Sequence, residues 1–134
     1  MKNSTDAYSS EPTSVLIIDD DESIRVSLKF HFEDCGYTTY SVETAEEALD
    51  LMENELINSV IVDLRLPGID GIEFIRQASK KWPDASYVIY TGSPIASIPD
   101  DILSISSVSS KLFFKPIDNL FELSNEINRL TSKS

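Results

Sequence analysis

The sequence predicts an α/β fold in which a five-stranded parallel sheet is flanked on both faces by helices. Short runs of aliphatic and β-branched residues recur along the chain, for example at 15–18 and 60–62. Such runs are typical of strands that are buried on both faces of a parallel sheet. Segments with apolar residues at helical spacing separate these runs, so that strand and helix alternate five times. No internal repeat or second domain is visible.

The bulk composition favours a single soluble domain. The chain has 134 residues, 41% of them apolar, and a formal net charge of −12. A surface this acidic argues against non-specific binding to nucleic acid or to an anionic membrane, and no apolar stretch approaches the roughly 20 residues that span a bilayer. The single cysteine precludes an internal disulfide. We expect a cytoplasmic protein with a flexible leader at 1–13, one domain at 14–131 and a short tail at 132–134.

The first half of the chain is expected to hold three strands and three helices. The segments are strands at 14–19, 37–42 and 59–63, and helices at 21–35, from Thr44 onward, and at 69–81. Asp21 is more simply the N-cap of its helix than a ligand, and Gly36 suits the left-handed position after a helix. Thr44 and Glu47 are spaced as a capping box.

The second half is less regular. Strands are expected at 85–91 and 111–114, and a last helix begins after Asp118 as its cap. Between the strands, residues 92–110 contain seven serines and two prolines. We therefore predict a short or irregular fourth helix.

Chemically reactive side chains follow four of the five predicted strands. Asp19 and Asp20 end the first, Asp63 the third, Thr91 the fourth and Lys115 the fifth. The carboxyl ends of parallel strands meet along one edge of the sheet, where ligands bind. Crowded carboxylates are usually neutralised by a divalent cation, and Mg²⁺ prefers oxygen ligands. Lysine and threonine are suited to phosphoryl oxygens, and an aspartate can attack phosphorus to form an acyl phosphate.

Four strings in order, VLIIDDDESIR, VIVDLRLPGIDGIEFI, YTGS and FFKPI, resemble the receiver domain of two-component response regulators over about residues 14–131. The resemblance implies a flavodoxin-like, doubly wound five-stranded parallel sheet of strand order 2-1-3-4-5 with five helices. It also implies that Asp63 accepts a phosphoryl group from a sensor histidine kinase or a histidine phosphotransfer protein. Thr91 and Lys115 would then hold the phosphoryl oxygens, and the Lys115–Pro116 bond would be cis.

The resemblance further implies a Mg²⁺ site, with Mn²⁺ as an alternative ion. Asp20 and Asp63 would bind the metal directly, Asp19 largely through water, and Arg65 through its main-chain carbonyl. Phosphorylation would repack the face formed by the fourth helix, fifth strand and fifth helix. That face would contact an unknown downstream protein or form a phosphorylation-dependent dimer.

The chain departs from the family pattern at Leu112, where many receivers carry an aromatic switch residue. Phe113 and Phe114 lie nearby, and strand alternation directs one of them into the core. Two further functions stay open: a Mg²⁺-dependent aspartyl phosphatase or phosphotransferase, and a receiver-like module that is never phosphorylated. His31 is expected to be a surface residue of its helix and not a ligand. Cys35 is expected to be a small core residue.

Overall fold

The structure, a computed structural model, describes residues 13–131. The strands are β1 (Ser14–Ile18), β2 (Thr38–Val42), β3 (Ser59–Val62), β4 (Ser86–Thr91) and β5 (Phe113–Phe114). The helices are α1 (Glu22–Asp34), α2 (Ala45–Asn54), α3 (Gly71–Lys81), α4 (Asp100–Leu103) and α5 (Phe121–Thr131), with a short 3-10 helix η1 (Ile95–Ser97) before α4. All strand pairs are parallel, in the order β2-β1-β3-β4-β5. The predicted fold class and strand order are confirmed. The tail, and all of the leader except Thr13, lie outside the described residues.

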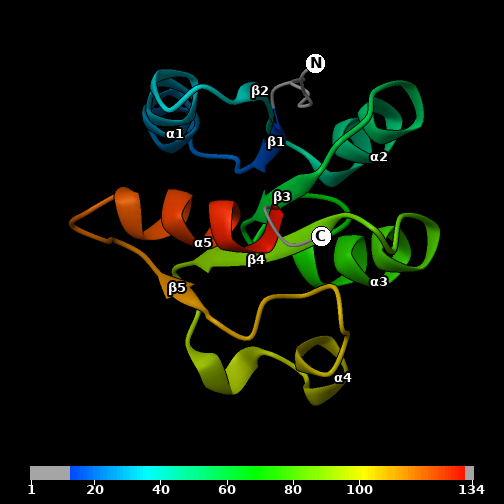
Figure 1. Ribbon diagram of the computed structural model, residues 1–134. Coiled ribbons are helices and arrows are strands. Elements are labelled where there is room, and N and C mark those ends of the chain that lie inside the picture. The colour runs from blue at the N-terminus through cyan, green and yellow to red at the C-terminus, as the bar shows by residue number, and fades with distance from the viewer. Residues whose placement is uncertain (1–12, 132–134) are drawn as a thin grey trace.

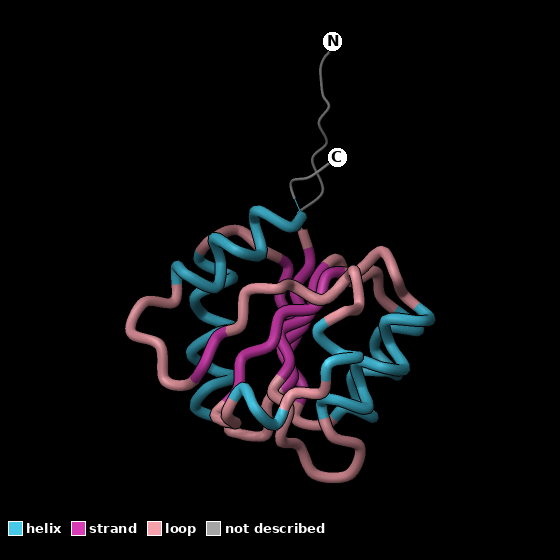
Figure 2. The backbone as a smooth tube through the Cα atoms, turned by 90° about the horizontal axis from the view of Figure 1, so that it is seen from below, coloured by secondary structure: helices cyan, strands magenta, loops and turns pink. Residues whose placement is uncertain are grey.

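The sheet separates two hydrophobic cores. Figure 2 shows the strands between two layers of helices. The labels of Figure 1 identify them: α1 and α5 cover one face of the sheet, and α2, α3 and α4 cover the other. Because side chains alternate along a strand, Leu16 and Val60 face the core of α2 to α4, while Ile17 and Ile61 face the core of α1 and α5. The central strands are therefore buried on both sides, as their uninterrupted apolar runs require.

Helix ends follow the sequence signals closely. The Asp21 carboxylate accepts hydrogen bonds from the amides of Ser23 and Ile24, so Asp21 is the N-cap of α1 as predicted. Gly36 has a φ of 95°, the left-handed conformation expected after this helix. Thr44 caps α2 through the amide of Glu47.

The fifth strand is shorter than predicted. Residues 111–114 were expected to pair with β4, but only Phe113 and Phe114 do so. An isolated bridge joins Tyr87 to Val108 further along β4. Between these two pairings the Ser109 hydroxyl accepts a hydrogen bond from the Lys111 amide, which turns the chain away from the sheet edge. Phe113 is buried and Phe114 is exposed, in agreement with the expected alternation.

The fourth helix is also short, as the sequence predicts. It spans the four residues Asp100–Leu103 and follows η1. Two buried isoleucines, Ile98 and Ile102, fix the segment to the core. A bidentate ion pair between Arg76 of α3 and Asp101 of α4 adds an exposed contact between the two helices.

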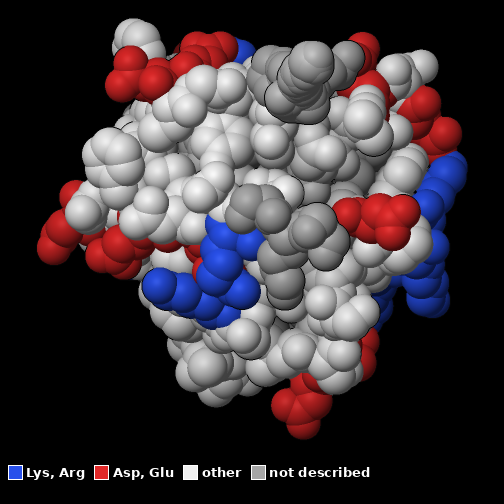
Figure 3. Space-filling view, viewed as in Figure 1, with Lys and Arg blue, Asp and Glu red and all other residues white. Residues whose placement is uncertain are grey.

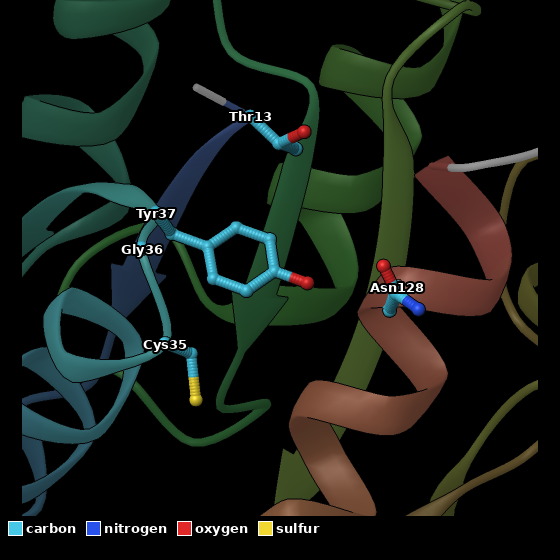
Figure 4. Close-up of a pocket in the computed structure, with 5 residues that line it drawn as sticks. All are labelled: Thr13, Cys35, Gly36, Tyr37 and Asn128. Atoms are coloured by element: carbon cyan, nitrogen blue, oxygen red, sulfur yellow. The ribbon is translucent and has the colours of Figure 1, made fainter.

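Two predictions near α1 and α5 need correction. Asp118 does not cap α5; the Asn119 side chain accepts the amide of Phe121, and the helix begins there. Cys35 is exposed instead of buried, because it follows the last turn of α1 and lines a surface pocket with Gly36, Tyr37 and Asn128 (Figure 4).

His31 lies on α1, as predicted, and is half-buried because it also contacts α5. Its Nε2 is 2.9 Å from the Ser124 hydroxyl, so that the side chain links α1 to α5. The ring packs edge-on against Phe32 and Phe121. Burial lowers the pKa of His31 despite the nearby Asp34 carboxylate.

Acidic side chains are spread around the margin of the face seen in Figure 3, and basic side chains gather near its centre and at one edge. Among residues 13–131, no helix combines the length and the apolar character that crossing a bilayer requires.

Candidate functional site: an acid cluster at the carboxyl edge of the sheet

Three carboxylates lie together where β1 and β3 end. Asp19 and Asp20 follow β1, and Asp63 follows β3, which pairs directly with β1. One oxygen from each lies within 4.8 Å of the others. The Asp63 amide donates to the Ile18 carbonyl and so holds the ends of β1 and β3 together, while the Asp19 amide donates to the Val42 carbonyl at the end of β2. We refer to Asp19, Asp20 and Asp63 as the acid cluster.

Asp63 is buried and both of its carboxylate oxygens have partners. Its side chain is 7% exposed. Oδ1 accepts from the Thr91 hydroxyl at 3.1 Å and from the Arg65 amide at 3.3 Å, while Oδ2 lies 3.2 Å from the Lys115 ammonium. The predicted residues from β3, β4 and the end of β5 therefore meet at this one side chain.

Lys115 bridges two members of the acid cluster. Its Nζ lies 2.6 Å from Oδ2 of Asp19 and 3.2 Å from Oδ2 of Asp63. Burial lowers the pKa of the ammonium, but the hydrogen bonds and charges of the two aspartates outweigh it, and the net pKa is raised. Lys115 is therefore protonated at neutral pH. The Lys115–Pro116 bond is cis, as predicted.

Asp19 and Asp20 differ in environment although they are neighbours in the chain. Asp19 is 2% exposed, and burial raises the pKa of its carboxyl group even though Lys115 and the Asp21 amide stabilise the charged form. Asp20 is exposed. Within residues 13–131 its carboxylate makes no ion pair and accepts no hydrogen bond, so both of its oxygens are available to a ligand.

Thr91 connects the acid cluster to the loop that follows β4. Its side chain is fully buried, and its hydroxyl donates to Asp63 while it accepts from the Ser93 amide at 3.1 Å. The Thr91 carbonyl accepts a hydrogen bond from the Lys115 amide at 2.8 Å, so the same residue also fixes the start of the loop that follows β5. A change at Asp63 can thus reach the segment before α4 through one hydroxyl group.

Arg25, which the sequence interpretation did not single out, also touches this edge. Its Nη1 donates to the main-chain carbonyl of Asp19 at 2.7 Å. The available signal was a basic residue about one turn into the helix that follows the first acids. Arg65 is exposed, and its amide contacts Asp63; the ligand role of its carbonyl stays a prediction.

Comparison with known proteins identifies the family. The sequence pattern of the response regulator receiver domain matches residues 15–121. The chain belongs to this family. It is a receiver domain of the kind used in two-component signalling, and such domains are phosphoacceptors in signal transduction and not turnover enzymes of the usual type.

Individual relatives agree with this assignment. The response regulator MprA of Mycobacterium sp. (strain KMS) is 32% identical over 80 residues, which cover 60% of this chain and 35% of MprA. The chain thus aligns with about a third of the length of that relative. A CheY-like receiver domain from Methanospirillum hungatei JF-1 superposes with a TM-score of 0.78 at 29% identity, covering 90% of this chain and 94% of the other.

A second solved structure bears on the acid cluster. The response regulator TrrA from Thermotoga maritima, described in complex with Mg²⁺ and BeF, superposes with a TM-score of 0.77 at 28% identity, covering 88% of this chain and 98% of TrrA. Among residues 13–131, the acid cluster of three carboxylates has one ion-paired cation, the Lys115 ammonium, which contacts Asp19 and Asp63 but not Asp20. This excess of negative charge and the all-oxygen donor set suit a hard divalent cation such as Mg²⁺.

Proposed function

We propose that this receiver accepts a phosphoryl group on Asp63, from a phosphohistidine of a sensor histidine kinase or a histidine phosphotransfer protein. The observation that carries the proposal is the environment of Asp63. Its buried carboxylate contacts both a hydroxyl donor, Thr91, and an ammonium, Lys115, and it belongs to an acid cluster with spare negative charge. Asp63 is the member of the cluster whose neighbours are suited to phosphoryl oxygens.

The transfer would proceed by attack of one Asp63 oxygen on phosphorus. The new O–P bond forms as the P–N bond to the donor imidazole breaks, and the imidazole nitrogen keeps the electron pair of that bond. Negative charge on the three phosphoryl oxygens then needs donors nearby. Lys115 and the Thr91 hydroxyl already lie within 3.2 Å of Asp63 and could move to those oxygens with small displacements.

We propose that Mg²⁺, or Mn²⁺ in its place, is held by Asp20 and Asp63, by Asp19 largely through water, and by the carbonyl of Arg65. When bound, the ion neutralises and orients the phosphoryl oxygens. Asp19 and Lys115 form a buried ion pair at 2.6 Å that anchors the lysine beside this site. Asp20 is exposed, and among the described residues no group occupies its two carboxylate oxygens, so both can face the ion or its waters.

The switch would act through the Thr91 hydroxyl. If Thr91 turns from Asp63 toward a phosphoryl oxygen, the Ser93 amide that it accepts from must follow or lose its partner. That would move the segment leading to η1 and α4, and would alter the face formed by α4, β5 and α5 for a downstream protein or a second copy. Leu112, which replaces the usual aromatic residue, is half-buried against the α2–α4 core and has no ring to turn inward.

A metal-dependent phosphatase is a weaker candidate. Such enzymes commonly carry a second aspartate two residues after the nucleophile as a general acid, and this chain has Arg65 there. We expect only slow hydrolysis of the acyl phosphate.

The proposal is tested by incubating the receiver with acetyl phosphate and Mg²⁺ and measuring its intact mass. We expect one added phosphoryl group on the wild type and none on Asp63→Asn, which keeps the size of the side chain and removes the nucleophile. A chelator should abolish the gain. Equal labelling of the two proteins, or none on the wild type, would refute the assignment of Asp63.

A further inference from the structure

We infer that Arg25 is a positioning residue for the metal site, acting through the main chain on Asp20. This inference rests on the proposed Mg²⁺ site and goes beyond it, since Arg25 supplies no metal ligand. Its Nη1 donates to the Asp19 carbonyl at 2.7 Å. That carbonyl belongs to the peptide unit joining Asp19 to Asp20.

Asp20 depends on this peptide unit more than the other two acids do. Asp19 is fixed by Lys115 and by the Asp21 amide, and Asp63 by Thr91 and Lys115. The Asp20 carboxylate has no such support in the described structure, and the side chain is exposed. The direction in which it leaves the chain is therefore set by the backbone, and Arg25 holds one end of that backbone unit.

The half-buried guanidinium is well suited to this task. Arginine keeps its charge at all relevant pH values, and its planar fork holds direction better than a flexible ammonium does. A charged donor to a carbonyl is also stronger than a neutral one. The positive charge of Arg25 also repels a cation at the acid cluster. When Arg25 is replaced, loss of positioning should raise the Kd for Mg²⁺, whereas loss of the charge should lower it.

The test measures Mg²⁺ binding by titration calorimetry, with Mg²⁺ alone as the probe. For Arg25→Met we expect the Kd to rise about tenfold, the usual scale for loss of a residue that orients a metal ligand. If charge dominated instead, the Kd would fall. Lys29→Met is the matched control, because Lys29 lies one turn further on α1 and donates to a carbonyl remote from the cluster, that of Thr39, at 2.8 Å. Its Kd should stay within about twofold of the wild type.

A double-mutant cycle separates positioning from general loss of structure. If Arg25 acts through Asp20, Arg25→Met should change the Kd by less than about twofold when Asp20 is already asparagine. Melting curves with chelator report whether each variant is folded. Arg25→Lys, which keeps the charge without the guanidinium fork, serves as a second variant and should give an intermediate Kd.

An unchanged or lower Kd in the variants of Arg25 that fold would overturn the inference and leave the proposed function intact. If Arg25→Met raised the Kd by the same roughly tenfold factor in the Asp20→Asn background, the inference would also be overturned. A wild type that binds no Mg²⁺ at millimolar concentration would overturn the proposed metal site and, with it, the role of Arg25.

Discussion

Replacement of Gly71, the first residue of α3, should destabilise the fold for a steric reason. A Cβ built on Gly71 would lie 2.2 Å from the Asp63 carbonyl oxygen and 2.7 Å from the Leu64 Cα. Both atoms belong to the backbone, so no side chain can rotate away. Relieving the overlap in Gly71→Ala requires the start of α3 and the end of β3 to separate by roughly 1 Å.

The expected magnitude follows from two opposing terms. Overpacking against a rigid backbone costs about 3 kcal/mol, and the better helix propensity of alanine returns at most about 1 kcal/mol. The free energy of unfolding should therefore fall by about 2 kcal/mol, and the Tm by about 8 °C for a domain of this size. Because Asp63 adjoins the displaced carbonyl, phosphorylation by acetyl phosphate should slow by up to about a hundredfold.

Gly92→Ala is the matched control, since a Cβ there meets no atom within 4 Å. Its stability should be unchanged or rise by about 0.5 kcal/mol, because alanine restricts the unfolded chain. Thermal unfolding followed by circular dichroism measures both variants against the wild type. A Tm for Gly71→Ala within about 2 °C of the wild type would refute the steric argument.

Two further predictions concern α5. Asn119→Ala should lower the free energy of unfolding by about 1 kcal/mol, as is usual for loss of an N-cap, while Asp118→Ala should leave it unchanged in the same denaturant titration; the opposite ranking would contradict the assigned cap. Hydrogen bonds from Arg129, followed by one from Ser109, hold the pKa of Glu126 below its usual 4.5. The charged form of Glu126 therefore stabilises the fold fully above about pH 4.5, and this contribution is lost as pH falls through the lower, folded pKa. Glu126→Gln should thus lose less stability than the wild type in urea titrations between neutral pH and that acidic range, and a parallel loss in both proteins would exclude this linkage.

The sequence predicted the sheet and its chemically reactive edge because both depend on local signals. A run such as 60–62 is typical of a doubly buried strand, and an acid that follows such a strand lies at the carboxyl edge of the sheet. The positions of the strand ends therefore predicted a cluster of four residues: Asp19, Asp63, Thr91 and Lys115. The roles of these residues in phosphoryl transfer remain predictions that the experiments above address.

The wrong predictions concern features that short-range sequence signals do not determine. Asp118 and Asn119 are both good cap residues, and in the structure it is the Asn119 side chain that accepts the Phe121 amide. The break in β5 depends on a single hydroxyl, Ser109, folding back on Lys111. The contact between His31 and Ser124 joins residues 93 positions apart, and no periodicity within one helix could reveal it.

The Thr91 hydroxyl joins Asp63 to the loop after β4, and any coupling of the two equilibria through it must be reciprocal. The hydroxyl donates a hydrogen bond to Asp63 and accepts one from the Ser93 amide. If phosphorylation of Asp63 favours one position of the loop by a given factor, then a protein that holds the loop in that position must favour phosphorylation by the same factor. A downstream partner that binds this position of the loop would therefore also stabilise the phosphorylated form of the receiver.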